Sequence, residues 1–175
     1  TGGDPTERAE IRFADDGFVD VFVGTQSTGQ GHETAYVMLT ADRLGVDGDK
    51  VRIFQGDTDT IPTGGGTGGA LSPYSEGQAI YATAATVIEK GRRAASEQLE
   101  AAMADIVFEA GRFSVTGTDR GVDIMTLAAT QRARIARGED APILDTAEVA
   151  NIAAHTFPNG CHIAEVEIDP ETGMV

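Results

Sequence analysis

Two glycine-rich segments contain the residues whose types and spacing best suit binding chemistry. The first, residues 27–33, reads Ser-Thr-Gly-Gln-Gly-His-Glu and lies between a predicted strand and a predicted helix. Gly29 and Gly31 permit positive φ and close approach of a ligand, and a helix starting near His32 directs free N–H groups to the same place. The Gln30 amide donates and accepts hydrogen bonds, which suits a neutral polar group. The alternative is a tight turn with a solvent-facing Gln30.

The second segment, residues 64–72, reads Gly-Gly-Gly-Thr-Gly-Gly-Ala-Leu-Ser and precedes the longest predicted helix. It formally satisfies G-x-G-x-x-G, but residues 56–63 separate it from the preceding strand, so the tight turn of a dinucleotide-binding unit cannot form. No Lys-Ser/Thr pair follows, which excludes a P-loop. A loop rich in backbone donors remains, with the hydroxyls of Thr67 and Ser72. It is either a linker or, because two such loops each lead into a helix, part of a backbone-lined pyrophosphate site.

Other polar clusters are weaker candidates. Asp57 and Asp59 lack the spacing of a calcium loop, so a solvated or turn-capping role is expected. The histidines and the cysteine lack metal-ligand spacing; they are His32, His155, His162 and Cys161. No G-x-S-x-G motif is present, and Glu165 and Glu167 are typical of the solvated face of a strand. The sequence offers no convincing general base and no metal site.

The composition limits the possible classes of protein. The chain has 175 residues, with 13 Lys+Arg and 28 Asp+Glu, and a formal net charge of −15. Such an acidic chain lacks the basic surface of a nucleic-acid binder and is repelled by anionic membranes. No apolar run approaches the roughly 20 residues of a membrane-spanning helix, and one cysteine excludes an internal disulfide. We therefore expect a cytoplasmic globular protein with neither nucleic acid nor membrane as partner.

The elements that position the two loops are of mixed type. Strands are predicted at residues 18–24, 51–55 and 161–168, with a hairpin at 106–116. Helices are predicted at residues 32–44, 74–103 and 122–137. Residues 142–156 give no readable pattern. The fold class expected is α+β, with a mixed β-sheet layered with two long helices.

Hydrophobic periodicity also predicts which helical side chains are buried. In the first helix these are Val37, Ala41 and Leu44, and Gly45 ends it. In the long helix they are Ile80, Ala84, Val87, Ile88, Ala95, Leu99 and Met103, with Gly91 weakening the middle.

Several linked blocks, in order, resemble the molybdopterin-binding domain of the molybdenum hydroxylases. That family includes xanthine dehydrogenase, aldehyde oxidase and the large subunit of aerobic carbon monoxide dehydrogenase. The blocks are residues 24–25 (GT), 29–34 (GQGHET), 41–45 (ADRLG), 56–59 (GDTD), 66–69 (GTGG), 156–160 (TFPNG) and 165–173 (EVEIDPETG). The resemblance, together with ends that read as cut, implies that residues 1–175 are a single fragment of a larger two-layer domain, truncated at both ends.

The resemblance assigns cofactor contacts to eight residues. In this family the GQG loop contacts the molybdenum cofactor, with its glutamine near the molybdenum, and the Thr-Gly-Gly-x-x-Ser segment wraps the pterin and its phosphates. The matching residues are Gly29, Gln30, Gly31, Thr67, Gly68, Gly69, Ala70 and Ser72. Many relatives have serine at the position of Ala70, whose backbone N–H stays available. The cofactor implied is molybdopterin, in its cytosine dinucleotide form.

The resemblance also implies a reaction, the oxidation of an aldehyde or N-heterocycle with oxygen derived from water. The family's catalytic glutamate lies in a downstream block that this chain lacks, so the fragment alone is expected to be inactive. Cys161 alone cannot hold an iron–sulphur cluster. Iron–sulphur clusters and FAD are expected on other segments or subunits, with the rest of the large subunit and a small-molecule substrate as partners. A non-catalytic acidic binding or structural module, with phosphate-binding glycine loops, is the alternative.

Overall fold

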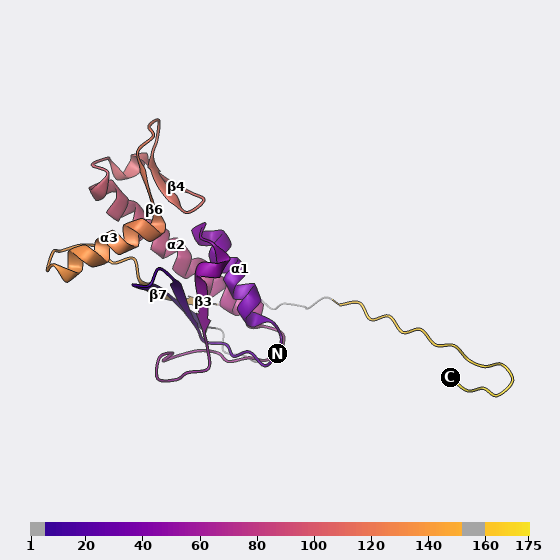
Figure 1. Cartoon of the computed structure of the whole chain (residues 1–175). Coiled ribbons are helices and arrows are strands. Elements are labelled where there is room, and N and C mark those ends of the chain that lie inside the picture. The colour runs from indigo at the N-terminus through magenta and orange to yellow at the C-terminus, as the bar shows by residue number, and fades with distance from the viewer. Residues whose placement is uncertain (1–5, 152–159) are drawn as a thin grey trace.

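The computed structural model describes residues 6–151 and 160–175 (Figure 1). Its strands are β1 (Thr6–Phe13), β2 (Val19–Val23), β3 (Val51–Phe54), β4 (Ile106–Glu109), β5 (Arg112–Val115), β6 (Gly121–Asp123) and β7 (Thr146–Asn151). Its helices are α1 (His32–Leu44), α2 (Ser72–Gln98) and α3 (Ile124–Ala136), with short 3-10 turns at Gly48–Lys50 and Met103–Asp105. The predicted α+β class is confirmed.

The main sheet is mixed, and helices cover one of its faces. Its strand order is β3-β2-β1-β7, with β2 and β3 parallel and the other two pairs antiparallel. The chain crosses from β2 to β3 through α1, which is the connection that a parallel pair requires. Helices α1 and α2 pack together and against the sheet (Figure 1). The valines of β2 point into this interface and are fully buried, as their alternation predicts; they are Val19, Val21 and Val23.

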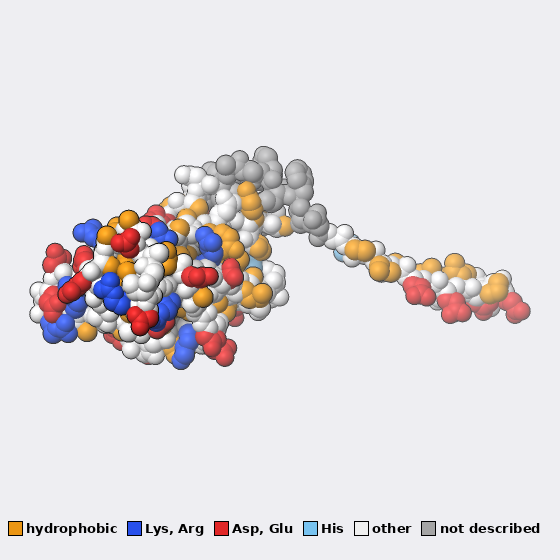
Figure 2. All heavy atoms as spheres, turned by 90° about the horizontal axis from the view of Figure 1, so that it is seen from above, with side chains coloured by type: hydrophobic (Ala, Val, Ile, Leu, Met, Phe, Trp, Pro, Cys, Tyr) orange, Lys and Arg blue, Asp and Glu red, His pale blue; other side chains and the backbone are white. Residues whose placement is uncertain are grey.

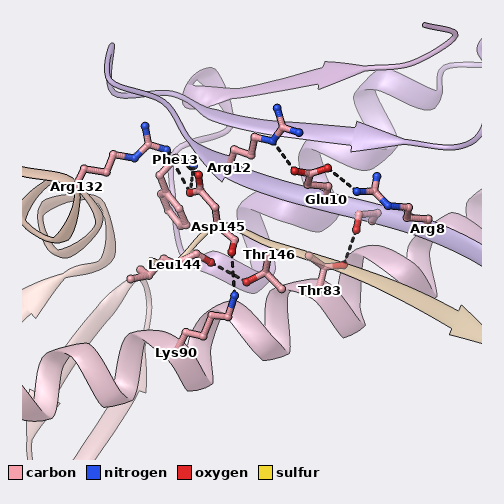
Figure 3. Close-up of polar contacts among 11 residues, drawn as sticks. Arg8, Glu10, Arg12, Phe13, Thr83, Lys90, Arg132, Leu144, Asp145 and Thr146 are labelled. Atoms are coloured by element: carbon pink, nitrogen blue, oxygen red, sulfur yellow. Dashed lines mark hydrogen bonds and ion pairs between the residues drawn. The ribbon is translucent and has the colours of Figure 1, made fainter. Parts of the chain in front are cut away.

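Two strands of this sheet, β1 and β7, have no counterpart in the sequence prediction. In β1 the alternate residues Ala9, Ile11 and Phe13 are buried. On the opposite face, Glu10 binds the guanidinium groups of Arg8 and Arg12 (Figure 3). A central strand that carries this many charges escapes recognition by hydrophobicity, although its period of two is regular.

Asp145 anchors the start of β7 to three other elements (Figure 3). Its Oδ1 accepts a hydrogen bond from the Phe13 backbone N–H at 3.0 Å. Both of its carboxylate oxygens accept from Nη2 of Arg132 on α3, at 3.2 and 3.0 Å. The Lys90 ammonium of α2 donates to the Asp145 carbonyl at 2.9 Å. Strand β7 is therefore fixed by long-range contacts, which explains why its local sequence gave no pattern.

The first helix matches its predicted range, but its buried face is rotated. The fully enclosed residues are His32, Tyr36, Thr40 and Leu44, whereas the predicted Val37 and Ala41 are only partly buried. Tyr36 is turned inward because its hydroxyl has a buried partner, Thr25 Oγ1, at 2.8 Å.

The long helix α2 ends earlier than predicted. Glu100 takes a left-handed conformation with φ of 48°, and the Ala101 N–H donates to the Ser96 carbonyl at 3.1 Å. This is a Schellman end without the usual glycine, so the sequence does not reveal it. Met103, predicted to be buried, is therefore 47% exposed, while Ile80, Ala84, Val87 and Ala95 are buried as predicted.

The remaining elements bear on two other predictions. The predicted hairpin is β4 and β5, extended by β6 into a small sheet, and α3 lies within the predicted range. Residues 161–168 are not a strand, because they pair with none of the described strands and are exposed. They extend away from the body (Figure 1), although the turn after them does form, with Gly173 N–H donating to Asp169 O at 2.8 Å.

Candidate functional site

The topology of the sheet brings the two glycine loops together. Strands β2 and β3 are parallel, so their carboxyl ends lie at the same sheet edge. The first loop, residues 24–31, leaves β2 at this edge, and the second, residues 55–71, leaves β3 there. Ligands of α/β sheets characteristically bind outside the carboxyl ends of such strands.

One side chain ties the loops to each other. The Thr67 hydroxyl donates to the Gln26 carbonyl at 2.6 Å and accepts from the Gln26 N–H at 2.9 Å. The Ser72 hydroxyl donates to Thr67 Oγ1 over 3.5 Å. The Thr67 hydroxyl both donates to and accepts from the backbone of Gln26, so it links the two loops. The donors that remain available for a ligand belong to the residues next to Thr67.

The two loops and the first residues of α1 and α2 line an open pocket of about 440 Å³. Six of the eight residues that the sequence singles out line it, namely Gln30, Thr67, Gly68, Gly69, Ala70 and Ser72. The other two, Gly29 and Gly31, flank Gln30 in the chain and are not part of the lining. His32 and Pro73 complete the wall.

Backbone donors dominate this pocket. Helix α1 begins after Gly31 and α2 after Leu71, and neither N-cap residue forms a side-chain cap, so N–H groups of both first turns are not capped by side chains. The lining contains neither lysine nor arginine. The Gln30 amide folds back on its own loop, accepting from the Thr28 N–H and donating to the Gln26 carbonyl at 3.4 Å. The arrangement can hold an anionic or polar ligand through dipoles.

His32 is a pocket residue that the sequence analysis considered only as a metal ligand, a role that its spacing excludes. It is 2% exposed, its ring centroid lies 5.2 Å from that of Tyr36, and its Nδ1 is buried without a hydrogen-bond partner. Burial lowers the pKa of His32, so the neutral imidazole is favoured. Its position directly after the GQG motif, as the first residue of α1, is the signal that could have identified it.

Two buried acids that contact the base of the two loops were also not predicted. Glu76 on α2 is 0% exposed, and Glu7 on β1 is buried as well. Nothing in the local sequence distinguishes Glu76 from the exposed glutamates of the same helix, and Glu7 lies on a strand that was not predicted.

The weaker sequence candidates do not form sites. Asp57 Oδ1 accepts from the Asp59 N–H at 3.0 Å, which is a turn-capping contact, as expected. Within residues 6–151 and 160–175 no group of three His, Cys, Asp or Glu side chains could hold a metal ion. Cys161 and His162 are exposed on the extended segment, and His155 lies outside the described residues.

Comparisons with known proteins identify the family. The whole chain, residues 1–175, matches the family model described as "Molybdopterin cofactor-binding domain". It is 36% identical to the 6-hydroxypseudooxynicotine dehydrogenase complex subunit gamma of Paenarthrobacter nicotinovorans, over 99% of this chain and 21% of that protein. It is 32% identical to the carbon monoxide dehydrogenase large chain of Afipia carboxidovorans, over 96% of this chain and 21% of that protein.

Solved structures agree. The Cu,Mo-CO dehydrogenase superimposes with a TM-score of 0.75 at 33% identity, covering 83% of this chain and 18% of that one. Quinoline 2-oxidoreductase from Pseudomonas putida 86 gives 0.71 at 28% identity, covering 86% and 19%. The chain thus belongs to the molybdopterin cofactor-binding domains of molybdenum hydroxylase large subunits. It spans about a fifth of the length of the relatives it matches. In the described part of the chain, no helix combines the length and apolarity needed to cross a membrane.

Proposed function

We propose that this chain forms part of the molybdopterin site in the catalytic large subunit of a molybdenum-dependent hydroxylase or dehydrogenase. The pocket in which both glycine loops meet carries the proposal, and the family membership supports it. The reaction proposed for the whole protein is oxidation of an aldehyde or N-heterocycle with water-derived oxygen. The rest of the large subunit, and iron–sulphur and flavin domains or subunits, are its proposed partners.

The bound cofactor supplies the molybdenum redox chemistry, and the residues of this chain bind and orient it. Backbone N–H groups of residues 68–70 and of the first turn of α1 are suited to its phosphates. Gln30 offers its amide once it leaves its own loop, and Ser72 offers a hydroxyl. The cytosine dinucleotide form is the one we propose. All eight residues singled out from the sequence remain its proposed contacts.

Gly68 is the pocket residue best suited to test the binding role. It does not have a positive φ, and a Cβ added to it would meet no atom within 4 Å. Neither backbone conformation nor packing in this chain therefore requires glycine at this position. A ligand that approaches the loop closely gives a reason for it.

The test is Gly68→Ala in the full-length protein that carries this chain, with molybdenum and pterin content as readout. We expect cofactor content to fall severalfold while thermal unfolding is unchanged. Gly160→Ala is the control, because a Cβ there would meet only His162 Nε2 at an ordinary contact distance of 3.8 Å and the residue lies on the extended segment. Full cofactor content in Gly68→Ala, or a wild-type protein without molybdenum, contradicts the proposal and favours the non-catalytic binding or structural module.

A further inference from the structure

A pair of buried acids lies where the two glycine loops leave the sheet. At this point the backbones of Gly24 and Gly64 touch, and a Cβ added to either would lie within 2.4 Å of the other's Cα. Glu7 approaches the same place from β1, because its Oε1 would lie 2.2 Å from a Cβ on Gly24. Glu76 reaches it from α2. Side chains of two separate elements therefore meet at the base of both loops.

Each acid holds one loop. Glu76 Oε2 accepts hydrogen bonds from the N–H groups of Gly24 at 3.1 Å and Thr25 at 3.3 Å, in the first loop. Both carboxylate oxygens of Glu7 accept from the Gly65 N–H at 3.1 Å, in the second loop. Glu76 also connects to the pocket wall, since the Thr25 hydroxyl pairs with Tyr36 Oη, whose ring faces His32.

The described contacts at the junction favour one negative charge over two. Among the described residues Glu76 has no ion pair, and the titratable groups that act on it are Glu7 of β1 and Tyr36 of α1. Burial, and then the charge of Glu7, raise the pKa of Glu76 to about 9. Glu76 Oε1 is buried without a partner, whereas its Oε2 accepts twice, so the proton belongs on Oε1. Glu7 accepts hydrogen bonds from the backbone N–H groups of Arg8 and Gly65, the latter through both oxygens, which is the pattern of an acceptor-only carboxylate.

We propose that Glu7 and Glu76 are positioning residues that share a single negative charge, with Glu76 protonated, and thereby keep the two glycine loops at the spacing that the cofactor pocket needs. The idea that the pocket holds a cofactor rests on the function proposed above. The charge sharing itself rests only on the contacts at the loop junction. When both carboxylates ionise, their repulsion in a buried site separates the loops.

The direction of the pH effect follows from proton linkage. The pKa of Glu76 rises from 4.5 to about 9 on folding, so the folded state binds more protons than the unfolded state between these values. The stabilisation associated with this proton is complete below about pH 4.5 and is lost as the pH rises through about 9. Glutamine at position 76 is always neutral, so it removes this slope.

The main test measures cofactor retention by the full-length holoenzyme, as molybdenum and pterin content after incubation from about pH 6 to about pH 10. The wild type is expected to lose cofactor with a midpoint near pH 9. In Glu76→Gln, and separately in Glu7→Gln, we expect this midpoint to rise by at least about one pH unit, since either change prevents the second charge. Glu89→Gln, an exposed residue of the same helix, is the control and should follow the wild type.

A second readout does not depend on the cofactor. Amide hydrogen exchange of Gly24, Thr25 and Gly65, corrected for intrinsic rates, should lose protection above about pH 9 in the wild type and keep it in Glu76→Gln. Infrared spectra should show a protonated carboxylic acid that disappears in Glu76→Gln.

A protein without molybdenum that shows both signals contradicts the proposed function but supports the charge pair. Identical alkaline profiles of wild type and Glu76→Gln, or cofactor loss at neutral pH in a folded Glu76→Gln, overturn the charge pair.

Discussion

The Thr67 hydroxyl forms hydrogen bonds with the other glycine-rich loop. Both hydrogen bonds go to the backbone of Gln26, which lies 41 positions earlier in the chain. The sequence suggests Thr67 as a ligand contact, but in the structure its hydroxyl holds the two loops together. Thr67 therefore affects ligand binding through the distance between the loops.

We predict that Thr67→Val, which keeps the shape but removes the hydroxyl, destabilises the fold by about 1 kcal/mol, because the freed Gln26 groups are exposed and can bind water. The cofactor content of the full-length protein should fall by more than this loss of stability alone would cause. Denaturant unfolding and pterin content are the measurements. Thr67→Ser retains the hydroxyl and should behave as the wild type; equal pterin content in the valine and serine variants would rule out the linking role.

Local sequence patterns identify most residues of the pocket wall but not the buried acids Glu7 and Glu76. The glycine motifs mark the loops, and parallel strands then bring the loops to one edge, so Gln30, residues 67–70 and Ser72 could be named in advance. The burial of Glu7 and Glu76 depends on which elements cover them. That information comes from the tertiary fold, and no local pattern contains it.

At the scale of elements, Gly91 is the residue whose role changes most between sequence and structure. In the sequence it only weakens the long helix. In the structure a Cβ at this position would lie 2.3 Å from Cζ of Phe113 on β5, so glycine lets the small sheet approach α2.

We predict that Gly91→Ala destabilises the protein by about 1–3 kcal/mol through overpacking, although alanine gains about 1 kcal/mol of helix propensity. Phe113→Leu in the same chain should recover part of the loss, and a double-mutant cycle of denaturant unfolding measures the coupling. Stabilisation by Gly91→Ala alone would mean that Phe113 moves aside without cost.

The elements that the sequence predicted are those with local signals. Strand β2 alternates regularly and helix α1 ends at a glycine, and both match their predicted ranges closely. Half of the residues of β1 are charged, β7 is fixed through Asp145, and α2 is followed by a glutamate in a left-handed conformation. Each of these depends on tertiary contacts or on unusual end chemistry, so local periodicity could not reveal them.

At the scale of the whole molecule, charge is distributed unevenly. The body carries acidic and basic side chains together, whereas the extended segment at residues 160–175 carries acidic and hydrophobic side chains but neither lysine nor arginine (Figure 2). Its large apolar residues are exposed, Ile163 at 90%. Alternating apolar residues on an unpaired extended segment favour pairing with another chain, and like charges oppose it.

We therefore predict that the 175-residue chain self-associates more strongly as salt increases, because screening weakens the repulsion between these segments. Sedimentation velocity at several protein concentrations measures this. Serine at Ile163, Val166 and Ile168 together should keep the chain monomeric. Met38→Ser, which removes an exposed apolar side chain from α1, is the control and should leave association unchanged. A wild-type chain that stays monomeric in high salt contradicts the prediction.

The pairing of β1 with β7 joins Thr6 to Asn151, the two ends of the described stretch of residues 6–151. On a ribosome, the strand at the centre of the main sheet is therefore made early and receives its second neighbour late. At about 5–20 residues per second, the interval is on the order of 10 s. During that time one edge of β1 is open to wrong partners. The charges of Arg8, Glu10 and Arg12, on the face of β1 that turns away from the buried core, are then expected to oppose aggregation of the strand before the sheet is complete.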